Sequence, residues 1–131
     1  MGQKYLIDSN VLIDYMADLI PAQGSDFVEN LFNTQFLISV ITKIEVLGYN
    51  DFPHKMLTMR NFIALSEILP LNETVTEKTI GLKCDFRKMK LGDAIIAATA
   101  ITYNLILITC NEKDFEMIEN LKVINPYNIK K

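Results

Sequence analysis

The stretch Tyr5-Leu6-Ile7-Asp8-Ser9-Asn10 decides the fold, because a short apolar, β-prone run ends there in three residues that favour turns and helix caps. Residues 11–17 then follow the pattern of a helix that closes before Pro21. A strand followed at once by a helix is the repeating unit of parallel α/β proteins. The sequence therefore predicts that this chain begins such a repeat at its first strand.

Later segments continue the alternation of β-prone and helical stretches. Periodic apolar residues predict helices over residues 25–33, 41–48, 53–67, 94–103 and 115–120, and a longer helix capped by Asn72 or Thr74 that runs towards Lys88. Short apolar runs predict strands over residues 36–40, 68–71, 105–109 and 122–124. Strands joined by helices pair in parallel through right-handed crossovers. We therefore expect a mostly parallel sheet covered by helices on both faces.

Length and composition are those of an ordinary globular chain. The 131 residues fit one domain, 1–131, and half of them are hydrophobic, which is enough for a substantial core. No apolar run approaches the roughly 18 residues of a membrane span, and the first residues lack a signal-peptide pattern. Two cysteines, Cys84 and Cys110, are too few for a disulfide framework. We expect a cytoplasmic protein that does not bind a membrane.

The net charge of −3 bears on the class of partner. Proteins that coat nucleic acids through charge alone are usually basic, so this class is disfavoured. The negative charge does not disfavour a nuclease, because acidic residues gathered at a metal site lower the net charge without making the remaining surface acidic.

Acidic side chains follow the predicted strands. Asp8 ends the first strand, and Glu45 lies about one helical turn beyond the second. Asp93 precedes the alanine-rich helix 94–103, and Asp114 follows the strand 105–109. Functional groups of parallel sheets gather at the carboxyl ends of the strands, so we expect these four acids to meet at one edge.

Carboxylates that converge raise each other's pKa unless a cation lies between them. Mg²⁺ and Mn²⁺ prefer oxygen ligands, and a carboxylate-held ion can activate water against a phosphodiester. A single histidine, His54, excludes a metal-free ribonuclease that uses paired histidines. Each acid also has a structural interpretation, since Asp8 and Asp114 suit helix caps and Glu45 suits a solvated helix face.

Four blocks of sequence carry a family resemblance: Tyr-Leu-Ile-Asp-Ser-Asn-Val-Leu-Ile (5–13), Ile-Thr-Lys-Ile-Glu-Val-Leu-Gly (41–48), Leu-Gly-Asp-Ala-Ile-Ile-Ala-Ala-Thr-Ala (91–100) and Leu-Ile-Thr-Cys-Asn-Glu-Lys-Asp-Phe (107–115). They resemble, in order, the signature blocks of PIN-domain nucleases, and in particular of bacterial VapC-type toxins. The resemblance implies a three-layer α/β/α sandwich with a parallel sheet of about five strands. It also implies Mg²⁺- or Mn²⁺-dependent hydrolysis of RNA that leaves 5′-phosphate and 3′-hydroxyl ends.

The resemblance assigns roles to individual residues. Asp8, Glu45 and Asp93 match the first three acids of the family, so Asp8 and Asp93 would hold the ion and Glu45 would ligate it or act as general base. Asp114 is the expected fourth acid, although Asn111 stands where many members have an acid and competes for that role. The expected supporting residues orient the carboxylates, supply a small hydroxyl or, for Asn111 beside Asp114, act as a neutral ligand or positioning group: Ser9, Asn10, Thr109 and Asn111.

Partners follow from the same resemblance and from the charge pattern. Lys83, Arg87, Lys88 and Lys90 precede Asp93 and are candidates for holding the RNA backbone, with a solvated helix face as the alternative. A VapC-type toxin implies a homodimer and a small antitoxin protein. The apolar faces of residues 25–33 and 53–67 are candidate surfaces for an antitoxin peptide, although core packing explains them equally well.

Three other classes remain for comparison. A phosphate-accepting regulatory domain needs an acidic pair near the first strand and a lysine after the last, and Lys113 is poorly placed for this. A phosphatase of the Asp-x-Asp type needs an aspartate where this chain has Asn10. The alternative within the family is a catalytically silent PIN-like domain that only binds RNA or a partner.

Overall fold

The computed structural model describes residues 2–130, in which five strands and six α-helices follow one another along the chain. The strands are β1 (Tyr5–Ile7), β2 (Leu37–Ser39), β3 (Glu67–Leu69), β4 (Ile106–Ile108) and β5 (Val123–Ile124). The helices are α1 (Ser9–Met16), α2 (Ala22–Thr34), α3 (Val40–Leu47), α4 (Pro53–Ile63), α5 (Glu73–Asp85) and α6 (Leu91–Thr102). Two short 3₁₀ helices, η1 (Glu112–Asp114) and η2 (Pro126–Asn128), flank β5.

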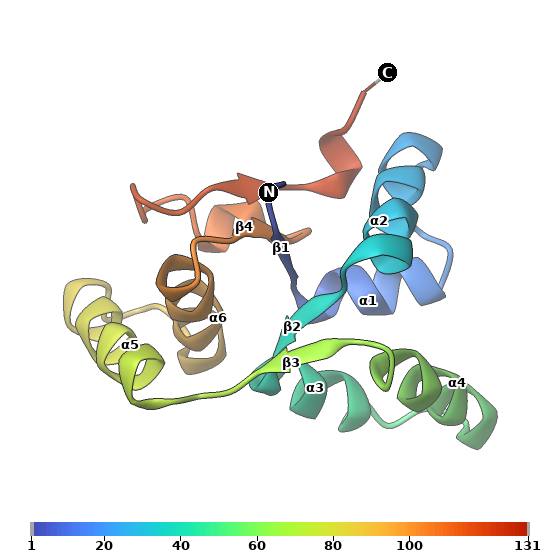
Figure 1. Cartoon of the computed structure of the whole chain (residues 1–131), viewed down its shortest axis with the longest axis horizontal. Helices are drawn as coiled ribbons and strands as arrows, with labels where there is room; N and C mark the ends of the chain where they lie inside the picture. Colours follow the sequence, from blue (N-terminus) through green and yellow to red (C-terminus); the bar gives the residue numbers. More distant parts are fainter. Residues whose placement is uncertain (1, 131) are drawn as a thin grey trace.

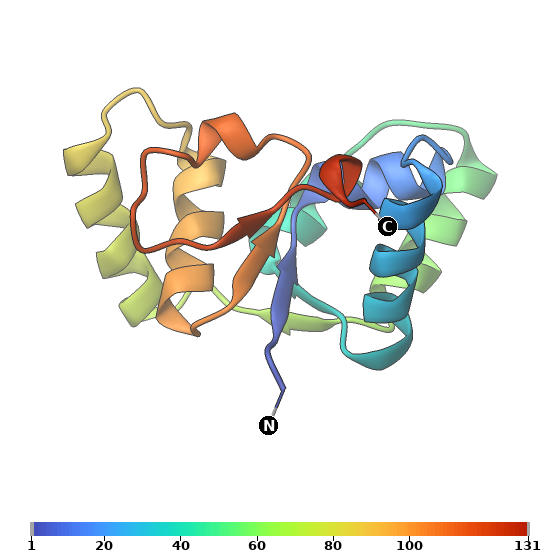
Figure 2. The same cartoon turned by 90° about the horizontal axis from the view of Figure 1, so that it is seen from above.

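All five strands pair in parallel in the order β3-β2-β1-β4-β5, with β1 at the centre. The chain moves from β1 outwards to β3 and then returns past β1 to β4. Because right-handed crossovers in opposite directions cover opposite faces, α1 to α4 lie on one side of the sheet and α5 and α6 on the other (Figures 1 and 2). The predicted α/β fold with both faces covered is confirmed.

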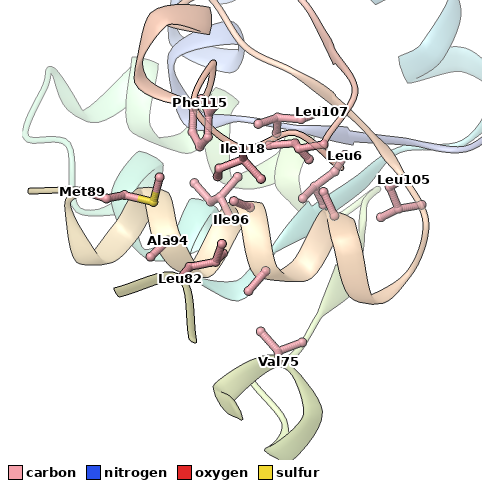
Figure 3. Packing of buried hydrophobic residues seen from close by; sticks show 14 of the residues in the cluster. Leu6, Val75, Leu82, Met89, Ala94, Ile96, Leu105, Leu107, Phe115 and Ile118 are labelled. Atoms are coloured by element: carbon pink, nitrogen blue, oxygen red, sulfur yellow. The ribbon is translucent and has the colours of Figure 1, made fainter. Parts of the chain in front are cut away.

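Alternation along the strands divides the core into two clusters. Leu6 aligns with Leu37 on one side and Leu107 on the other, and this row of leucines packs against α6. Figure 3 shows α6 between Leu6 and Leu107 of the sheet and Leu82 of α5. The intervening isoleucines, among them Ile7 of β1, face α1, α2 and α4 instead. A slip of one residue would exchange the two faces, so this pattern holds the register.

Several predicted boundaries are wrong. The alanine-rich helix begins at Leu91 rather than at residue 94, so Asp93 lies inside its first turn. The predicted helices over 53–67 and towards Lys88 end earlier, at Ile63 and Asp85. The helix expected over 115–120 is absent from this part of the structure, where consecutive turns follow η1.

Phe115, Ile118 and Leu121 explain the error in the last of these segments. They are buried at intervals of three residues, a spacing that suggests a helix. Backbone N–H groups of Ile118 and Leu121 donate to the carbonyl oxygens three residues earlier, so each turn directs one apolar side chain into the core. Successive turns and a helix produce the same apolar spacing, and the sequence pattern does not distinguish them.

Within residues 2–130, none of the helices combines the length and the apolar character needed to span a membrane.

Candidate active site

Asp8 lies at the carboxyl end of β1, where it is 3% exposed and caps the N-terminus of α1. Its Oδ1 accepts a hydrogen bond of 2.8 Å from the backbone N–H of Ser9. Its Oδ2 accepts hydrogen bonds from the hydroxyl of Thr109 at 2.8 Å and from the side-chain amide of Asn10 at 3.2 Å. Burial raises the pKa of Asp8, and these hydrogen bonds oppose that increase. Donors on both oxygens therefore hold the carboxylate in one orientation.

The pleat of the sheet explains why Thr109 meets Asp8. Leu6 and Leu107 are register partners whose side chains face α6. Asp8 lies two residues after Leu6, and Thr109 lies two residues after Leu107. Side chains two residues apart in extended backbone face the same side of a sheet, and Asp8 is still extended, so Asp8 and Thr109 face the same side as the leucines. The parity that buries the leucines thus brings Asp8 and Thr109 to the edge above α6.

Asn10 and Thr109 join the loop after β1 to the loop after β4. The Asn10 amide donates to the Thr109 hydroxyl at 3.2 Å, and the Asn10 carbonyl oxygen accepts from the backbone N–H of Cys110 at 2.9 Å. The backbone N–H of Asn111 donates to the Thr109 hydroxyl at 3.1 Å. These contacts fix two loops that are distant in sequence around the Asp8 carboxylate.

Glu45 reaches this edge from α3, which begins directly after β2 with Ser39 as its cap. The Ser9 hydroxyl donates to Glu45 Oε1 at 3.0 Å. The other oxygen, Oε2, lies 3.4 Å from the position that a Cβ atom on Gly92 would take. Gly92 therefore allows the Glu45 carboxylate to approach the first turn of α6.

Asp93 is half-buried in that first turn. Burial is the main cause that raises its pKa to about 6, followed by the negative charges of Asp8 and Asp114, with a smaller increase from Glu45. The charge of Lys90 acts in the opposite direction. Asp114 closes η1 and is exposed. The structure therefore brings the four predicted acids to one edge, since Ser9 links Asp8 to Glu45, Glu45 lies beside Gly92, and Asp93 and Asp114 line one cavity.

The donor set suits a hard divalent cation. Within residues 2–130, no group of three or more Asp, Glu, His or Cys side chains is arranged closely enough to hold an ion by itself. Mg²⁺ does not need such a cage, because it keeps several waters and uses one or two carboxylates together with substrate phosphate. The mutual repulsion that raises the pKa of Asp93 would be relieved by a cation, so these residues fit Mg²⁺ or Mn²⁺.

The four basic residues before Asp93 do not have the same surroundings. The ammonium group of Lys83 donates to the backbone carbonyl oxygens of Met89, at 2.5 Å, and Arg87, at 3.3 Å. Arg87, Lys88 and Lys90 belong to the loop between α5 and α6 and are exposed. Lys83 thus connects to the loop itself, whereas the other three present their charges to solvent.

The C-terminal segment makes a contact that the sequence does not indicate. The side-chain amide of Asn125 donates to the carbonyl oxygen of Cys110 and to Glu112, each at 3.3 Å. The hydroxyl of Tyr127 donates to Asp14 Oδ2 at 2.8 Å, which shows that Asp14 anchors this segment. Asn125 precedes Pro126, a pair that marks a turn, but nothing in the local pattern names the distant loop that it contacts.

Comparisons with known proteins agree with this geometry. The family model for the PIN domain matches residues 5–121. Ribonuclease VapC10 from Mycobacterium tuberculosis is 29% identical over 121 residues, which cover 89% of this chain and 90% of the relative.

Solved structures show the same likeness. A toxin–antitoxin complex from Klebsiella pneumoniae contains a chain with 32% identity and a TM-score of 0.78, and the match covers 96% of this chain and 100% of that one. DNA-bound VapBC from Salmonella typhimurium shares the fold with a TM-score of 0.81 at 21% identity, over 95% of this chain and 99% of the other. The family match spans four of the five strands in full and both loops that hold Asp8. This chain therefore belongs to the PIN-domain family and is related to the VapC ribonucleases.

Proposed function

We propose that this protein is a Mg²⁺- or Mn²⁺-dependent ribonuclease and the toxin of a toxin–antitoxin pair. The observation that supports the activity most directly is the convergence of the four acids at one edge of the sheet. Ser9 contacts both Asp8 and Glu45, Glu45 Oε2 lies beside Gly92, and Asp93 and Asp114 line one cavity. Acids kept together against their mutual repulsion are costly to a fold, and a metal-dependent active site accounts for that cost.

Asp8 and Asp93 would hold the cation, with Asp114 as the fourth acid at the exposed side. When bound, a divalent cation activates a water molecule and neutralises charge that develops on the phosphodiester. Hydrogen bonds from Ser9, Asn10 and Thr109 keep the Asp8 carboxylate oriented before any ligand arrives.

Glu45 would complete the site as a ligand or as the general base. The Ser9 hydroxyl occupies Glu45 Oε1, so Oε2, near the first turn of α6, is the atom left to accept a proton from the attacking water. Hydrolysis of this kind releases 5′-phosphate and 3′-hydroxyl ends.

The toxin assignment adds a protein partner. A surface groove of about 360 Å³ lies between α1, α3 and α4, and its apolar lining includes Ile13, Met16, Val46 and Met59. Such a groove suits a short apolar peptide, and methionines adapt to its shape. We propose an antitoxin segment as the occupant, because related chains are found in VapBC complexes. Both predicted surfaces contain core residues, such as Leu31 and Ile63, but only residues 53–67 line this groove, through Met56 and Met59, which makes them the better candidate.

A homodimer is part of the same proposal. Ile44 and Leu91 are each 61% exposed, and they neighbour Glu45 and Gly92 in sequence. A second copy of the chain would cover these two apolar side chains beside the acidic edge. Light scattering of the purified protein measures its mass in solution directly, and a monomer at all concentrations would contradict the homodimer.

Cleavage of RNA tests the activity. Asp93→Asn removes one expected ligand with almost no change in shape, so metal-dependent cleavage of cellular RNA should be abolished while the circular dichroism spectrum is retained. Asp26→Asn is the matched control, because Asp26 is exposed in α2, a helix that contributes none of the predicted site residues. It changes the net charge equally and should cleave like the wild-type protein.

Two results would count against the proposal. Undiminished cleavage by a clean Asp93→Asn preparation would exclude the acidic cluster as the active site. A wild-type protein that binds RNA but never cuts it with Mg²⁺ or Mn²⁺ would indicate the catalytically silent PIN-like alternative. Growth arrest on expression, lost in the same variant, would support the role as a toxin.

A further inference from the structure

A second surface feature adjoins the acidic edge. A cavity of about 420 Å³ opens between the α5–α6 loop and η1. Its lining contains four basic residues, two acidic residues and three apolar residues: Arg87, Lys88, Lys90 and Lys113; Asp93 and Asp114; and Phe86, Met89 and Met117. The cavity therefore shares Asp93 and Asp114 with the cluster of acids and adds cations that the cluster lacks.

The charge in this cavity is unusually concentrated for an acidic chain. The chain has 13 lysines and arginines and a net charge of −3. Arg87, Lys88, Lys90 and Lys113 place four of those cations around one cavity, although Lys113 comes from a segment on the far side of α6 in the sequence. Only the fold brings them together, so the grouping is not a simple run of charged residues along one helix.

The loop that carries three of these cations is anchored from below. Met89 is buried in the core beside α6, and its backbone N–H donates to the carbonyl oxygen of Phe86 at 3.0 Å. Lys83 holds the same loop through the carbonyl oxygens of Arg87 and Met89. With the backbone fixed in this way, binding at Arg87, Lys88 and Lys90 requires ordering of their side chains but no further ordering of the loop.

We propose that this cavity is a subsite for the sugar–phosphate backbone of single-stranded RNA, next to the bond cleaved at the acidic cluster. Arg87, Lys88, Lys90 and Lys113 contact the phosphates, and Met117, which is 42% exposed, offers an apolar surface to a base. Lys83 is a positioning residue that shapes the loop and does not touch RNA. The proposal rests on the ribonuclease function proposed above.

The arrangement favours a polyanion that crosses both surfaces over an acidic peptide that binds only the cations. A phosphodiester at Asp93 and Asp114 has a second phosphate one nucleotide away, and the cavity is the neighbouring basic surface that is able to receive it. The regular spacing of phosphates along an RNA strand therefore explains why basic and acidic side chains line the same cavity.

The salt dependence of binding tests this subsite. A fluorescently labelled, mixed-sequence single-stranded RNA is titrated with protein at several salt concentrations in Mg²⁺, and every protein carries Glu45→Gln to prevent cleavage. Lys90→Gln or Lys113→Gln should each reduce the slope of log affinity against log salt by about 0.7, the value for one lost contact to a single strand. Affinity itself should fall by roughly tenfold or less at low salt.

Lys78→Gln is the matched control, because Lys78 is exposed on α5 and does not line this cavity. It removes the same charge and should leave the slope unchanged. Equal reductions for Lys78, Lys90 and Lys113 would overturn the subsite in favour of diffuse attraction, as would unchanged slopes for both cavity lysines.

The two proposals fail in different ways. Cleavage by the wild-type protein together with unchanged slopes would overturn the subsite and leave the ribonuclease function intact. Reduced slopes for the cavity lysines, in a protein that never cleaves RNA, would support an RNA-binding cavity and remove the proposed catalysis. An acidic peptide that binds more tightly than RNA and competes for the same lysines would overturn the choice of ligand.

Discussion

The carboxylate of Asp93 is half-buried, feels three other negative charges and has a pKa raised to about 6. Asp8 is more deeply buried, but the hydroxyl of Thr109 and the amide of Asn10 donate hydrogen bonds to it. Two acids of the same cluster thus differ in how the protein supports their charge. The difference predicts that the same substitution has opposite effects on stability at the two positions.

Asp93→Asn should stabilise the metal-free protein at pH 7, because it removes a charge that the fold disfavours. Solvent screening of a half-exposed group keeps the gain to about 1 kcal/mol. Asp8→Asn should instead destabilise by about 1–3 kcal/mol, because an amide nitrogen would face donors that now bind a carboxylate oxygen. Thermal unfolding in EDTA measures both, with Asp26→Asn as a neutral control. Equal shifts at positions 8 and 93 would contradict this account.

At this scale the sequence predicts the site residues only partly. Residues that follow a strand directly, such as Asp8, are located by the rule that parallel strands present functional groups at their carboxyl ends. Lys83 could not be located in this way, because its contacts with the carbonyl oxygens of Arg87 and Met89 depend on the path of a loop. By charge and position in the sequence, Lys83 resembles Arg87, Lys88 and Lys90. Only its hydrogen bonds to the loop backbone show that it has a different role.

Among the elements, α2 and η2 pack unusually closely. A Cβ atom added to Gly24 of α2 would overlap the backbone carbonyl of Pro126 in η2. Gly81 lies inside α5 and has no atom within 4 Å of the equivalent position. Two glycines in helices therefore provide a matched comparison of packing against helix propensity.

Gly24→Ala should destabilise the protein by about 1–3 kcal/mol, because backbone atoms cannot move aside as a flexible side chain would. Gly81→Ala should stabilise by up to about 1 kcal/mol, because alanine favours the helix and nothing obstructs it. Urea unfolding with an unchanged m-value for both variants measures the free energies. A Gly24→Ala protein as stable as the wild type would mean that η2 does not pack on α2 in solution.

Element types were easier to predict than element ends. The helix α6 begins at Leu91, before Gly92 and Asp93, which the sequence suggests as a turn ahead of the helix. Its cap residue, Lys90, makes no side-chain hydrogen bond to the helix. No local residue announces such a start, and the burial of α6 between the sheet and α5 overrides the weak signal. The helix predicted over residues 115–120 is wrong for a related reason, because the apolar spacing of these turns matches that of a helix.

For the whole molecule, alternating strands and helices predict the parallel sheet, but they do not fix the order of its strands. That order depends on which edge each crossover reaches, and it appears only when the leucine row of β2, β1 and β4 is assembled. The convergence of the acids depends on the same order, because β1 and β4 are neighbours only after the chain reverses its direction across the sheet.

Stability of the metal-free protein should decrease as pH rises from about 4 to about 6. The folded protein keeps a proton on Asp93 up to a pKa of about 6, whereas the unfolded chain loses it near 3.8, so the folded state binds more protons in this window. Stability present below pH 4 is therefore lost as pH rises, and the raised pKa of Asp8 acts in the same direction.

Differential scanning fluorimetry across this range, with and without Mg²⁺, measures the effect. Mg²⁺ should restore the lost stability at pH 7 and have little effect at pH 4, where protonated acids bind it poorly. The decrease should be smaller in Asp93→Asn. A thermal stability in EDTA that does not change with pH would show that the clustered acids do not destabilise the folded protein.

The two sides of the sheet support different surface features of the protein. The cluster behind the leucines supports Asp93 and the basic cavity, while the cluster behind the isoleucines supports the groove between α1, α3 and α4. Substitutions of groove residues on α1 and α4 are therefore expected to leave the surroundings of α6 unchanged, whereas α3 contacts α6 and also lines the groove. Val46 of α3 lines the groove and lies beside Glu45, so α3 is the element through which an occupant of the groove would affect the acidic edge.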